Sequence, residues 1–351
     1  MKILIITAKY PALKCGVGTY TSFLFNSLRK VEPNIKVITS SRVKKKNKAI
    51  VGLISNSSLY SFIKIKNFVA EWKQKIIHFQ YTPTAFKNLM VIFLLYFFFF
   101  TKKKVIFTWH ELFYKKSYIF YFLISVAKPQ IIVVRKDFKK KLNRFAKIVV
   151  PKINFIPSSV TLDYKKNYSE KNLRESLLPQ KYKRLFIFYG YIFPHKNIEL
   201  ITKIINFETD YVVISSYFDK NNKYSAQVLN FLKKDEFKKN FLIKYIDDSM
   251  LGHVLRVVDA IILPFNVEIG SWNTTINNAI NSKSFTLTNS IIRRGYDPQN
   301  NIYYAKFNNS DEMKRALNKY SAKKNKDNIC INKWSLIAKK HLQLYNQICK
   351  N

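Results

Sequence analysis

Short runs of β-branched residues alternate with stretches of helical periodicity along almost the whole chain, and this alternation restricts the fold more than any other feature. The run KILIIT at 2–7 predicts a buried strand, and the apolar residues of 19–30 repeat on one helical face. Further strands are expected at 35–40, 75–81, 103–110, 130–134 and 153–159, with apolar helices at 84–100 and 118–127. Because strands that alternate with helices are joined by crossovers, this half predicts a parallel sheet.

The same alternation begins again after residue 183. Strands are expected at 184–190, 210–216, 241–246, 260–265 and 284–288, and helices at 197–205, 249–258, 274–282, 311–324 and 333–349. The sequence therefore predicts an α/β fold of two Rossmann-like, doubly wound domains that face a cleft. We expect an N-terminal domain at 1–163, a charged link at 164–183, a C-terminal domain at 184–332 and a final helix at 333–351 that packs back on the N-terminal domain.

The cysteines and the apolar runs indicate in which cellular compartment the chain is expected. The three cysteines have no paired spacing, so neither a disulfide framework nor a zinc ribbon is expected, and a reducing compartment is favoured. The N-terminus turns polar too early for a signal peptide. The longest apolar run, 89–100, is shorter than the roughly 18–20 residues that span a bilayer. We expect a cytoplasmic protein, soluble or peripheral on the inner face of the cytoplasmic membrane.

The chain is strongly basic, with 61 Lys and Arg against 21 Asp and Glu, a formal charge of +40. One explanation is a Lys-rich, AT-rich coding composition, and the other is attraction to phospholipid, nucleic acid or a phosphorylated substrate. Lys far outnumbers Arg, the usual residue for reading bases. No specific nucleic-acid partner is therefore expected.

Two of only 7 glycines, Gly16 and Gly18, stand between the first predicted strand and helix. Glycines in such a loop allow positive φ or let backbone N–H groups approach an anion. The dinucleotide fingerprint is not met, because Thr21 stands where its third glycine belongs, and no phosphate-loop lysine follows. An ordinary tight turn is the alternative.

Comparable residues follow the strands of the second half. Gly190 ends its first strand, and Lys196, before a helix, is placed to meet a diphosphate unless it is an ordinary surface lysine. The strand at 260–265 is followed by Glu268 and Gly270, and then by a helix start with free N–H groups and the hydroxyls of Ser271, Thr274 and Thr275. Simple N-capping by Thr274 is the alternative there.

Together these motifs resemble the GT-B glycosyltransferases of the large group 4 of retaining enzymes. KCGVGTYTSFL is similar to the family's first glycine loop, and IIHFQYTPTAF and VIFTWHELF to its next strand ends. INFIPSSV resembles its Ile-Pro-Asn-Gly-Val turn, FYGYIFPHKNIELI its Gly-Arg…Lys-Gly stretch, and DAIILPF with TTINNAINSKSFTLTNS its donor site. WSLIAKKHLQLYNQI resembles its terminal helix, so the resemblance runs nearly end to end.

The resemblance implies transfer of a hexosyl or related sugar from a nucleotide-diphosphate sugar to a glycan or lipid-linked acceptor, in surface polysaccharide or glycolipid synthesis. It implies retention and no cofactor. By the same resemblance, Gly16 and Gly18 would face the β-phosphate and acceptor, and Lys196 would neutralise the diphosphate. His110 would lie beside the sugar, Glu268 would hydrogen-bond its hydroxyls, and phosphate would meet Thr274 and Thr275.

Two residues depart from the family pattern. Tyr191 stands where an arginine is expected, and Asn277 where a second glutamate usually holds the ribose. A non-catalytic homologue that binds nucleotide sugars therefore stays open as an alternative, with a basic nucleic-acid-binding protein behind it. Turnover and salt dependence of binding separate these classes.

The remaining polar motifs favour no metal. A histidine at a strand end, as in the WHEL of His110 and Glu111, is often only a structural hydrogen bonder, and His78 is expected to be one. The other three histidines lack metal spacing, and Asp247 and Asp248 do not form the Asp-x-Asp of metal-dependent transferases.

The stretch LMVIFLLYFFFFTKKK allows two interpretations. A helix that is apolar on every side is usually buried, here as a crossover on the N-terminal sheet. The alternative is partial exposure, with Phe and Leu in a membrane interface and Lys102, Lys103 and Lys104 at anionic headgroups.

Overall fold

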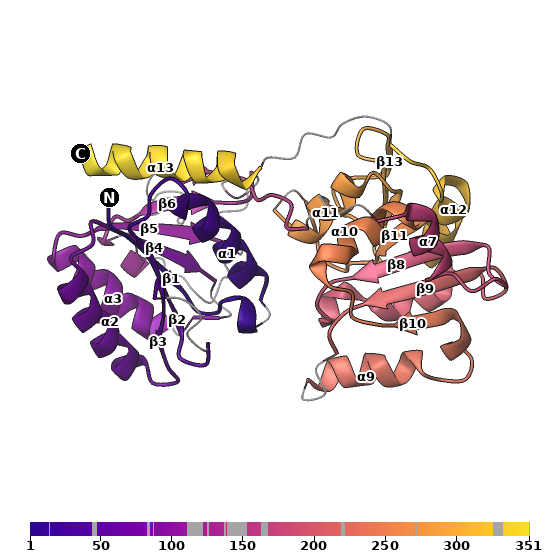
Figure 1. The fold of residues 1–351 in the computed structure, drawn as a ribbon, viewed down its shortest axis with the longest axis horizontal. Helices are drawn as coiled ribbons and strands as arrows, with labels where there is room; N and C mark the ends of the chain where they lie inside the picture. The colour runs from indigo at the N-terminus through magenta and orange to yellow at the C-terminus, as the bar shows by residue number, and fades with distance from the viewer. Residues whose placement is uncertain are drawn as a thin grey trace. The chain divides into compact units, whose positions relative to one another are not determined.

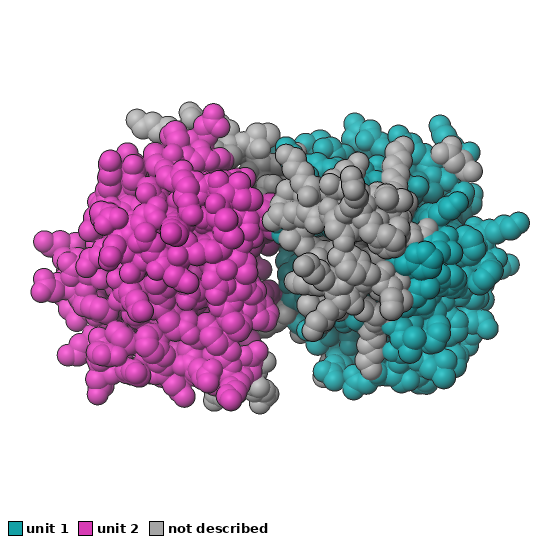
Figure 2. All heavy atoms as spheres, turned by 180° about the vertical axis from the view of Figure 1, so that it is seen from behind, with its two compact units in different colours: residues 1–161, 332–351 teal, residues 162–331 magenta. Residues whose placement is uncertain are grey.

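The computed structural model describes residues 1–13, 15–43, 48–82, 85–86, 88–110, 122–124, 126–136, 138, 153–162, 168–218, 222–270, 272–325 and 333–350. The chain divides into two compact units, coloured separately in Figure 2. Unit 1 comprises residues 1–161 and 332–351, and unit 2 comprises residues 162–331. Each is an α/β unit built on a mainly parallel sheet, as the alternation of strands and helices predicted.

In its described part, unit 1 has a seven-stranded sheet in the order β3-β2-β1-β4-β5-β6-β7, with every pairing parallel. The strands are β1 (Ile3–Thr7), β2 (Ile35–Ser40), β3 (Ile50–Ile54), β4 (Ile76–Tyr81), β5 (Lys104–Trp109), β6 (Gln130–Val133) and β7 (Ile153–Phe155). Its described α-helices are α1 (Gly16–Arg29), α2 (Ser58–Trp72), α3 (Asn88–Phe100) and α13 (Trp334–Lys350). A 3-10 turn, Pro11–Leu13, precedes α1. Figure 1 shows α2 and α3 on one side of this sheet and α1 and α13 on the other.

The central strand β4 is buried along its whole length. Successive side chains of a strand point to opposite faces, so Phe79 packs against Phe98 of α3, with ring centres 6.2 Å apart. His78 points the other way and meets Tyr345 of α13. Helices cover both faces of the sheet, which explains why a strand such as β1 reads as an almost continuous apolar run.

The C-terminal helix α13 packs on α1 within unit 1. Trp334 stacks on Phe23 with ring centres 5.5 Å apart, and its Nε1–H donates to the Val160 carbonyl at 2.6 Å. Tyr20 meets the edge of the same indole at 4.9 Å. The last helix is therefore fixed at its first turn by both aromatic contact and a hydrogen bond.

Helix α3 is buried on one side and exposed on the other, so each interpretation of its apolar sequence describes one side. Met90, Val91, Leu94, Leu95 and Phe98 are buried against the sheet. The opposite side stays in solvent, with Leu89 56% and Phe100 76% exposed. The helix is thus a crossover that keeps one apolar face uncovered among the described residues.

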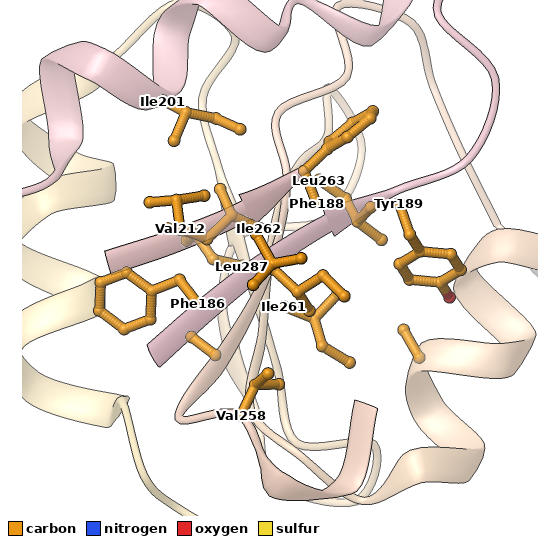
Figure 3. Packing of buried hydrophobic residues seen from close by; sticks show 14 of the residues in the cluster. Phe186, Phe188, Tyr189, Ile201, Val212, Val258, Ile261, Ile262, Leu263 and Leu287 are labelled. Atoms are coloured by element: carbon orange, nitrogen blue, oxygen red, sulfur yellow. The ribbon is translucent and has the colours of Figure 1, made fainter. Parts of the chain in front are cut away.

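Unit 2 has, in its described part, a seven-stranded sheet in the order β10-β9-β8-β11-β12-β14-β13, antiparallel only between β13 and β14. The strands are β8 (Arg184–Tyr189), β9 (Asp210–Ser215), β10 (Phe241–Ile243), β11 (Ala260–Leu263), β12 (Thr286–Asn289), β13 (Gly295–Asp297) and β14 (Ile302–Ala305). The α-helices are α7 (Glu170–Glu175), α8 (Ile201–Ile204), α9 (Lys223–Leu232), α10 (Asp248–Val257), α11 (Thr274–Ser282) and α12 (Ser310–Tyr320). The 3-10 turns are Pro194–Lys196, Ile198–Leu200 and Lys238–Asn240. Figure 3 shows the core, in which β8 and β11 pack side chains such as Phe186, Phe188 and Ile262.

The segment expected as an interdomain link has its described part, 168–183, within unit 2. Helix α7 lies there and is capped by Ser169, whose Oγ accepts from the Asn172 N–H. Arg174 on this helix pairs with Asp259 at 2.6 Å and donates to the Val257 carbonyl. This part of the charged segment is therefore packed structure that closes the edge of unit 2.

Candidate functional site

In unit 2, the strand order reverses between β8 and β11, since β9 and β10 follow on one side and β12 and β14 on the other. Open α/β sheets bind ligands beyond the carboxyl ends of their strands at such a point. Gly190 follows β8 there with φ +114°, a conformation that side chains rarely adopt. A Cβ on it would lie 3.8 Å from Thr275 Oγ1, and the Tyr189 hydroxyl donates to the Thr275 carbonyl. The structure thus brings Gly190 and Thr275 together.

Lys196 ends the 3-10 turn that follows β8 and is only 6% exposed. Its Nζ lies 3.9 Å from the centre of the Phe265 ring, and no carboxylate or hydrogen-bond acceptor among the described residues meets it. The Asn266 N–H donates to the His195 carbonyl at 3.0 Å and ties this turn to the end of β11. Burial lowers the pKa of Lys196 to about 7. Lys196 is therefore not an ordinary surface lysine, and a buried cation without a counter-charge is typical of a functional site.

Helix α11 begins at Thr274, as expected, but Thr274 is not its N-cap. Asn273 is the N-cap, and its Oδ1 accepts from the Thr275 N–H at 2.9 Å. The alternative of simple N-capping by Thr274 is therefore wrong, because Asn, one residue earlier, makes the better-placed side-chain acceptor. The hydroxyls of Thr274 and Thr275 have no hydrogen-bond partner among the described residues, so both stay available to a ligand at this helix start.

Gly270 precedes this helix start, and Asn277 lies within the helix. Gly270 gives room to the Trp272 ring, which would lie 2.4 Å from a Cβ at that position. Asn277 is buried on α11, 4% exposed, with its backbone N–H bonded to the Asn273 carbonyl. Ser271 lies outside the described residues. Gly270 thus has a packing role that the sequence did not indicate.

The Glu268 carboxylate is held by the segment that follows β12. Ser290 Oγ–H donates to Glu268 Oε1 at 2.8 Å, and the Ile291 N–H donates to Oε2 at 2.7 Å. Each oxygen keeps a further lone pair. Glu268 therefore anchors the segment that follows β12. Its carboxylate is also a hydrogen-bond acceptor held in a fixed position at the carboxyl edge of the sheet.

Tyr191 follows Gly190 directly, where the resemblance expects an arginine. Its ring lies 6.4 Å from Phe193, which in turn stacks on His195 at 5.6 Å. This stretch therefore presents aromatic surface beside Lys196 in place of a second cation.

In unit 1, His110 follows β5 and is held on three sides. Its Nε2 lies 2.8 Å from Gln80 Oε1, its backbone N–H donates to the Tyr81 carbonyl, and Tyr20 meets its ring edge at 4.8 Å. Burial, with a smaller effect of His341, lowers the pKa of His110 to about 3. The imidazole is therefore neutral near pH 7. Its neighbour Glu111 lies outside the described residues.

Gly16 and Gly18 lie in the first turn of α1, not in a loop before it. Neither has positive φ, so the expectation of a left-handed backbone is wrong. A Cβ on Gly18 would lie 2.9 Å from the Lys9 carbonyl oxygen, whereas one on Gly16 would meet open space. Cys15 gives the helix no side-chain cap, which leaves its first N–H groups uncapped. Gly18 therefore serves close backbone packing, and Gly16 borders an open helix start.

A pocket of about 640 Å³ opens at the carboxyl ends of β1, β2 and β3. Its lining is mixed, with Lys9, Ser40, Arg42, Ser55 and Ser57 as polar members and Leu13, Ile54, Phe86 and Met90 as apolar ones. Sequence patterns did not indicate this pocket, because β3 and α2 were not recognised as elements and no motif marks its polar residues.

No group of three His, Cys, Asp or Glu side chains in the described part of the chain is arranged to hold a metal ion. The described histidines serve other contacts, such as the pairing of His78 with Tyr345. Metal-independent transfer stays a prediction. No helix among the described residues has the length and apolar character needed to cross a membrane.

Known structures share this fold over the whole chain. A sucrose-phosphate synthase from Thermosynechococcus elongatus superposes with a TM-score of 0.77 at 13% identity, covering 100% of both chains. A glycosyltransferase from Rickettsia africae gives 0.70 at 15% identity, covering 100% of this chain and 99% of that one. HepE from Anabaena, in complex with UDP, gives 0.69 at 11% identity with the same coverage.

No family model and no curated protein sequence matches the chain. Similarity at such low identity defines the fold and leaves the chemistry to the residues. The chain therefore has the GT-B fold of two Rossmann-like α/β domains, in common with glycosyltransferases.

Proposed function

We propose that this protein is a glycosyltransferase that moves a sugar from a nucleotide-diphosphate sugar to a glycan or lipid-linked acceptor. The observation that carries the proposal is Lys196, a buried lysine at the strand-order reversal of unit 2 that meets no carboxylate among the described residues. A diphosphate is the ligand that such a cation lacks. The fold is that of HepE, which has been solved with UDP and with UDP-glucose.

In the proposed reaction, the nucleoside diphosphate leaves and its charge grows in the transition state. Lys196, the hydroxyls of Thr274 and Thr275, and the N-terminus of α11 are suited to stabilise that charge. The bond between the anomeric carbon and the phosphate oxygen breaks, and the acceptor oxygen forms the new bond. Glu268 would fix sugar hydroxyls with its remaining lone pairs.

The low basicity of the His110 imidazole is consistent with retention, the outcome in the group 4 enzymes. With same-face attack, the departing phosphate oxygen takes the acceptor proton, and no separate base is needed. An inverting enzyme would require a base, and His110, which the resemblance places beside the sugar, is the candidate for it. A pKa lowered to about 3 makes that imidazole a weak base, so we favour retention.

A non-catalytic homologue that binds nucleotide sugars is the second candidate. It is favoured by Tyr191 in place of a cation and by the buried, uncharged Asn277 in place of a glutamate. Calorimetric titration with UDP, GDP and ADP, and with their glucose derivatives, tests the proposal. Tight binding of one nucleotide without turnover would support the second candidate. Binding to nucleic acid alone, falling steeply with salt, would refute both.

We predict that Glu268→Ala still binds the free nucleoside diphosphate but loses roughly 10²-fold in transfer rate, the scale of one lost transition-state contact. The reason is that a carboxylate aimed at sugar hydroxyls does not contact the nucleotide. Calorimetry and donor turnover measure the two effects. Ser290→Ala is the control, since it removes one donor to the carboxylate and keeps the carboxylate itself. Equal loss of nucleotide binding in Glu268→Ala would show a structural role.

We further propose that the exposed face of α3 and its following lysines meet an anionic membrane, where a lipid-linked acceptor would lie. Leu89, Phe93, Phe99 and Phe100 are exposed large apolar residues of this helix. Lys102, Lys103 and Lys104 follow its last turn, and each lysine near an anionic surface contributes about 1 kcal/mol. Apolar insertion and charge attraction therefore act at the same end of the helix.

Cosedimentation with vesicles tests this surface. We expect binding to phosphatidylglycerol-containing vesicles that weakens with salt and with replacement of Lys102, Lys103 and Lys104 by glutamate. The matched control reverses the same amount of charge in unit 2, at the exposed Lys233, Lys234 and Lys239. If both triple variants bind alike, the attraction is only net charge. If the wild type ignores such vesicles at low salt, the acceptor is soluble.

A further inference from the structure

A chain of hydrogen bonds runs from His110 through the interior of unit 1 to the C-terminal helix. His110 Nε2 lies 2.8 Å from Gln80 Oε1, and Gln80 Nε2 lies 3.1 Å from His78 Nε2. His78 Nδ1 lies 2.5 Å from the Tyr345 hydroxyl, and Thr108 Oγ1 lies 2.7 Å from His78 Nε2. Four side chains from β4, the end of β5 and α13 are thus joined in one line.

The Gln80 amide fixes the direction of this chain. Its NH₂ group only donates, so His78 Nε2 accepts and the His78 proton is on Nδ1, where it donates to Tyr345. Its carbonyl oxygen only accepts, so His110 Nε2 carries the proton at the other end. Both imidazoles are then neutral with defined tautomers.

The surroundings favour neutral rings. His78, Gln80 and Tyr345 are fully buried, and among the described residues the two imidazoles also face His341 of α13 and Tyr20 of α1. Neither supplies a negative charge. Burial lowers the pKa of His78 well below its usual range, as it does that of His110. In a neutral ring, the tautomer decides which nitrogen donates and which accepts.

We propose that Gln80 and His78 are positioning residues that hold His110 as its Nε2–H tautomer, which leaves Nδ1 as a hydrogen-bond acceptor for a substrate hydroxyl. Nδ1 has no partner in the described part of the chain, and it is not one of the fully enclosed polar atoms without a partner. The buried His341 Nε2, by contrast, is such an atom. The substrate half of this inference rests on the proposed function, but the tautomer does not.

The consequence is a restriction on what His110 can contact. An acceptor nitrogen suits the O–H of a sugar or acceptor hydroxyl, and it disfavours a phosphate oxygen, which also only accepts. His110 would therefore contact a hydroxyl of the substrate rather than a phosphate oxygen. The reversed chain, with Tyr345 donating to His78, would give the opposite tautomer and the opposite preference.

Nitrogen-15 NMR of the intact protein labelled at histidine tests the tautomer directly. The chain has five histidines, and His110→Gln and His78→Gln assign two of the signals by their loss. We expect a protonated Nε2 and an unprotonated Nδ1 for His110 at pH 7, and the reverse for His78. A protonated Nδ1 on His110, or an imidazolium, overturns the proposal.

Two Tyr→Phe variants separate the hydrogen-bonded chain from general packing. Tyr345→Phe removes the acceptor of the His78 proton, and should shift His110 toward the Nδ1–H form. Tyr20→Phe keeps the ring against His110 and removes a buried hydroxyl without a described partner, so the wild-type signal should persist. Equal spectra for both variants overturn the role of Tyr345. If no nucleotide sugar is turned over, the proposed function fails, while the tautomer is still decided by these spectra.

Discussion

Lys196→Ala is expected to lower turnover of the nucleotide sugar by roughly 10²–10³-fold, the scale of removing one preorganised charge-stabilising group. The lysine is buried at the end of the turn that follows β8, and its described contact is the Phe265 ring. A bound diphosphate would favour the protonated form of Lys196. The charged lysine would in turn stabilise the negative charge that grows on the diphosphate in the transition state. Donor turnover by release of nucleoside diphosphate measures the effect.

Replacement of Lys196 should not lower the stability of the folded chain. The Lys196 pKa lies near 7 in the folded chain and near 10.4 when unfolded, so between these values the unfolded state binds more protons. Stability from this group therefore rises with pH from about 7 to about 10. Lys196→Met should remove that rise and leave the melting temperature at pH 7 unchanged or higher, because an uncompensated buried charge is gone.

A nearby exposed lysine gives the matched control. Lys203 of α8 is in solvent, so Lys203→Ala should keep full activity and the same melting temperature. Activity of Lys196→Ala within about twofold of wild type would remove Lys196 from the site, whatever its effect on stability.

Gly16→Val and Gly18→Val should differ in their effects on stability and on sugar transfer. A side chain at Gly18 meets the Lys9 carbonyl at 2.9 Å, so Gly18→Val should lower the melting temperature and abolish transfer together. A side chain at Gly16 meets nothing, and would occupy the space beside the uncapped start of α1, where we propose that an anion or acceptor binds. Gly16→Val should therefore lose roughly 10²-fold in transfer, the cost of displacing a substrate by about 1 Å, at an unchanged melting temperature.

Thermal melting and donor turnover of the two variants decide the role of this turn. If Gly16→Val transfers sugar normally, the helix start binds no substrate and Gly18 is only a packing glycine. Normal transfer by Gly18→Val would contradict the packing account as well.

The fold follows from the sequence where strands are buried on both faces. β1 and β8 are such strands, and each reads as a nearly continuous apolar run. β3 was missed because its residues are half-buried at the sheet edge, and α2 because its buried stripe is only Ser61, Ile65 and Val69. The Ser57 N-cap of α2 was the available signal.

Much of the candidate site followed from the position of residues at strand ends, and less from what surrounds them. The place of Lys196 after β8 is visible in the sequence, but its burial depends on Phe265, which lies 69 residues further along the chain. The hydrogen bonds of His110 with Gln80 and of His78 with Tyr345 likewise join segments far apart in sequence, so no motif marks them. Residue patterns locate the edge of a sheet, whereas contacts between distant segments decide charge and tautomer.

Transfer itself is the most direct test of the central claim. The wild-type protein is incubated with UDP-, GDP- and ADP-sugars and with glycan and lipid extracts, and mass spectrometry follows both the released nucleoside diphosphate and the glycosylated product. The account predicts product from one nucleotide class, lost in Lys196→Ala and kept in Lys203→Ala. If no donor is consumed and no nucleoside diphosphate binds to the folded wild-type protein, the assignment of sugar transfer is contradicted.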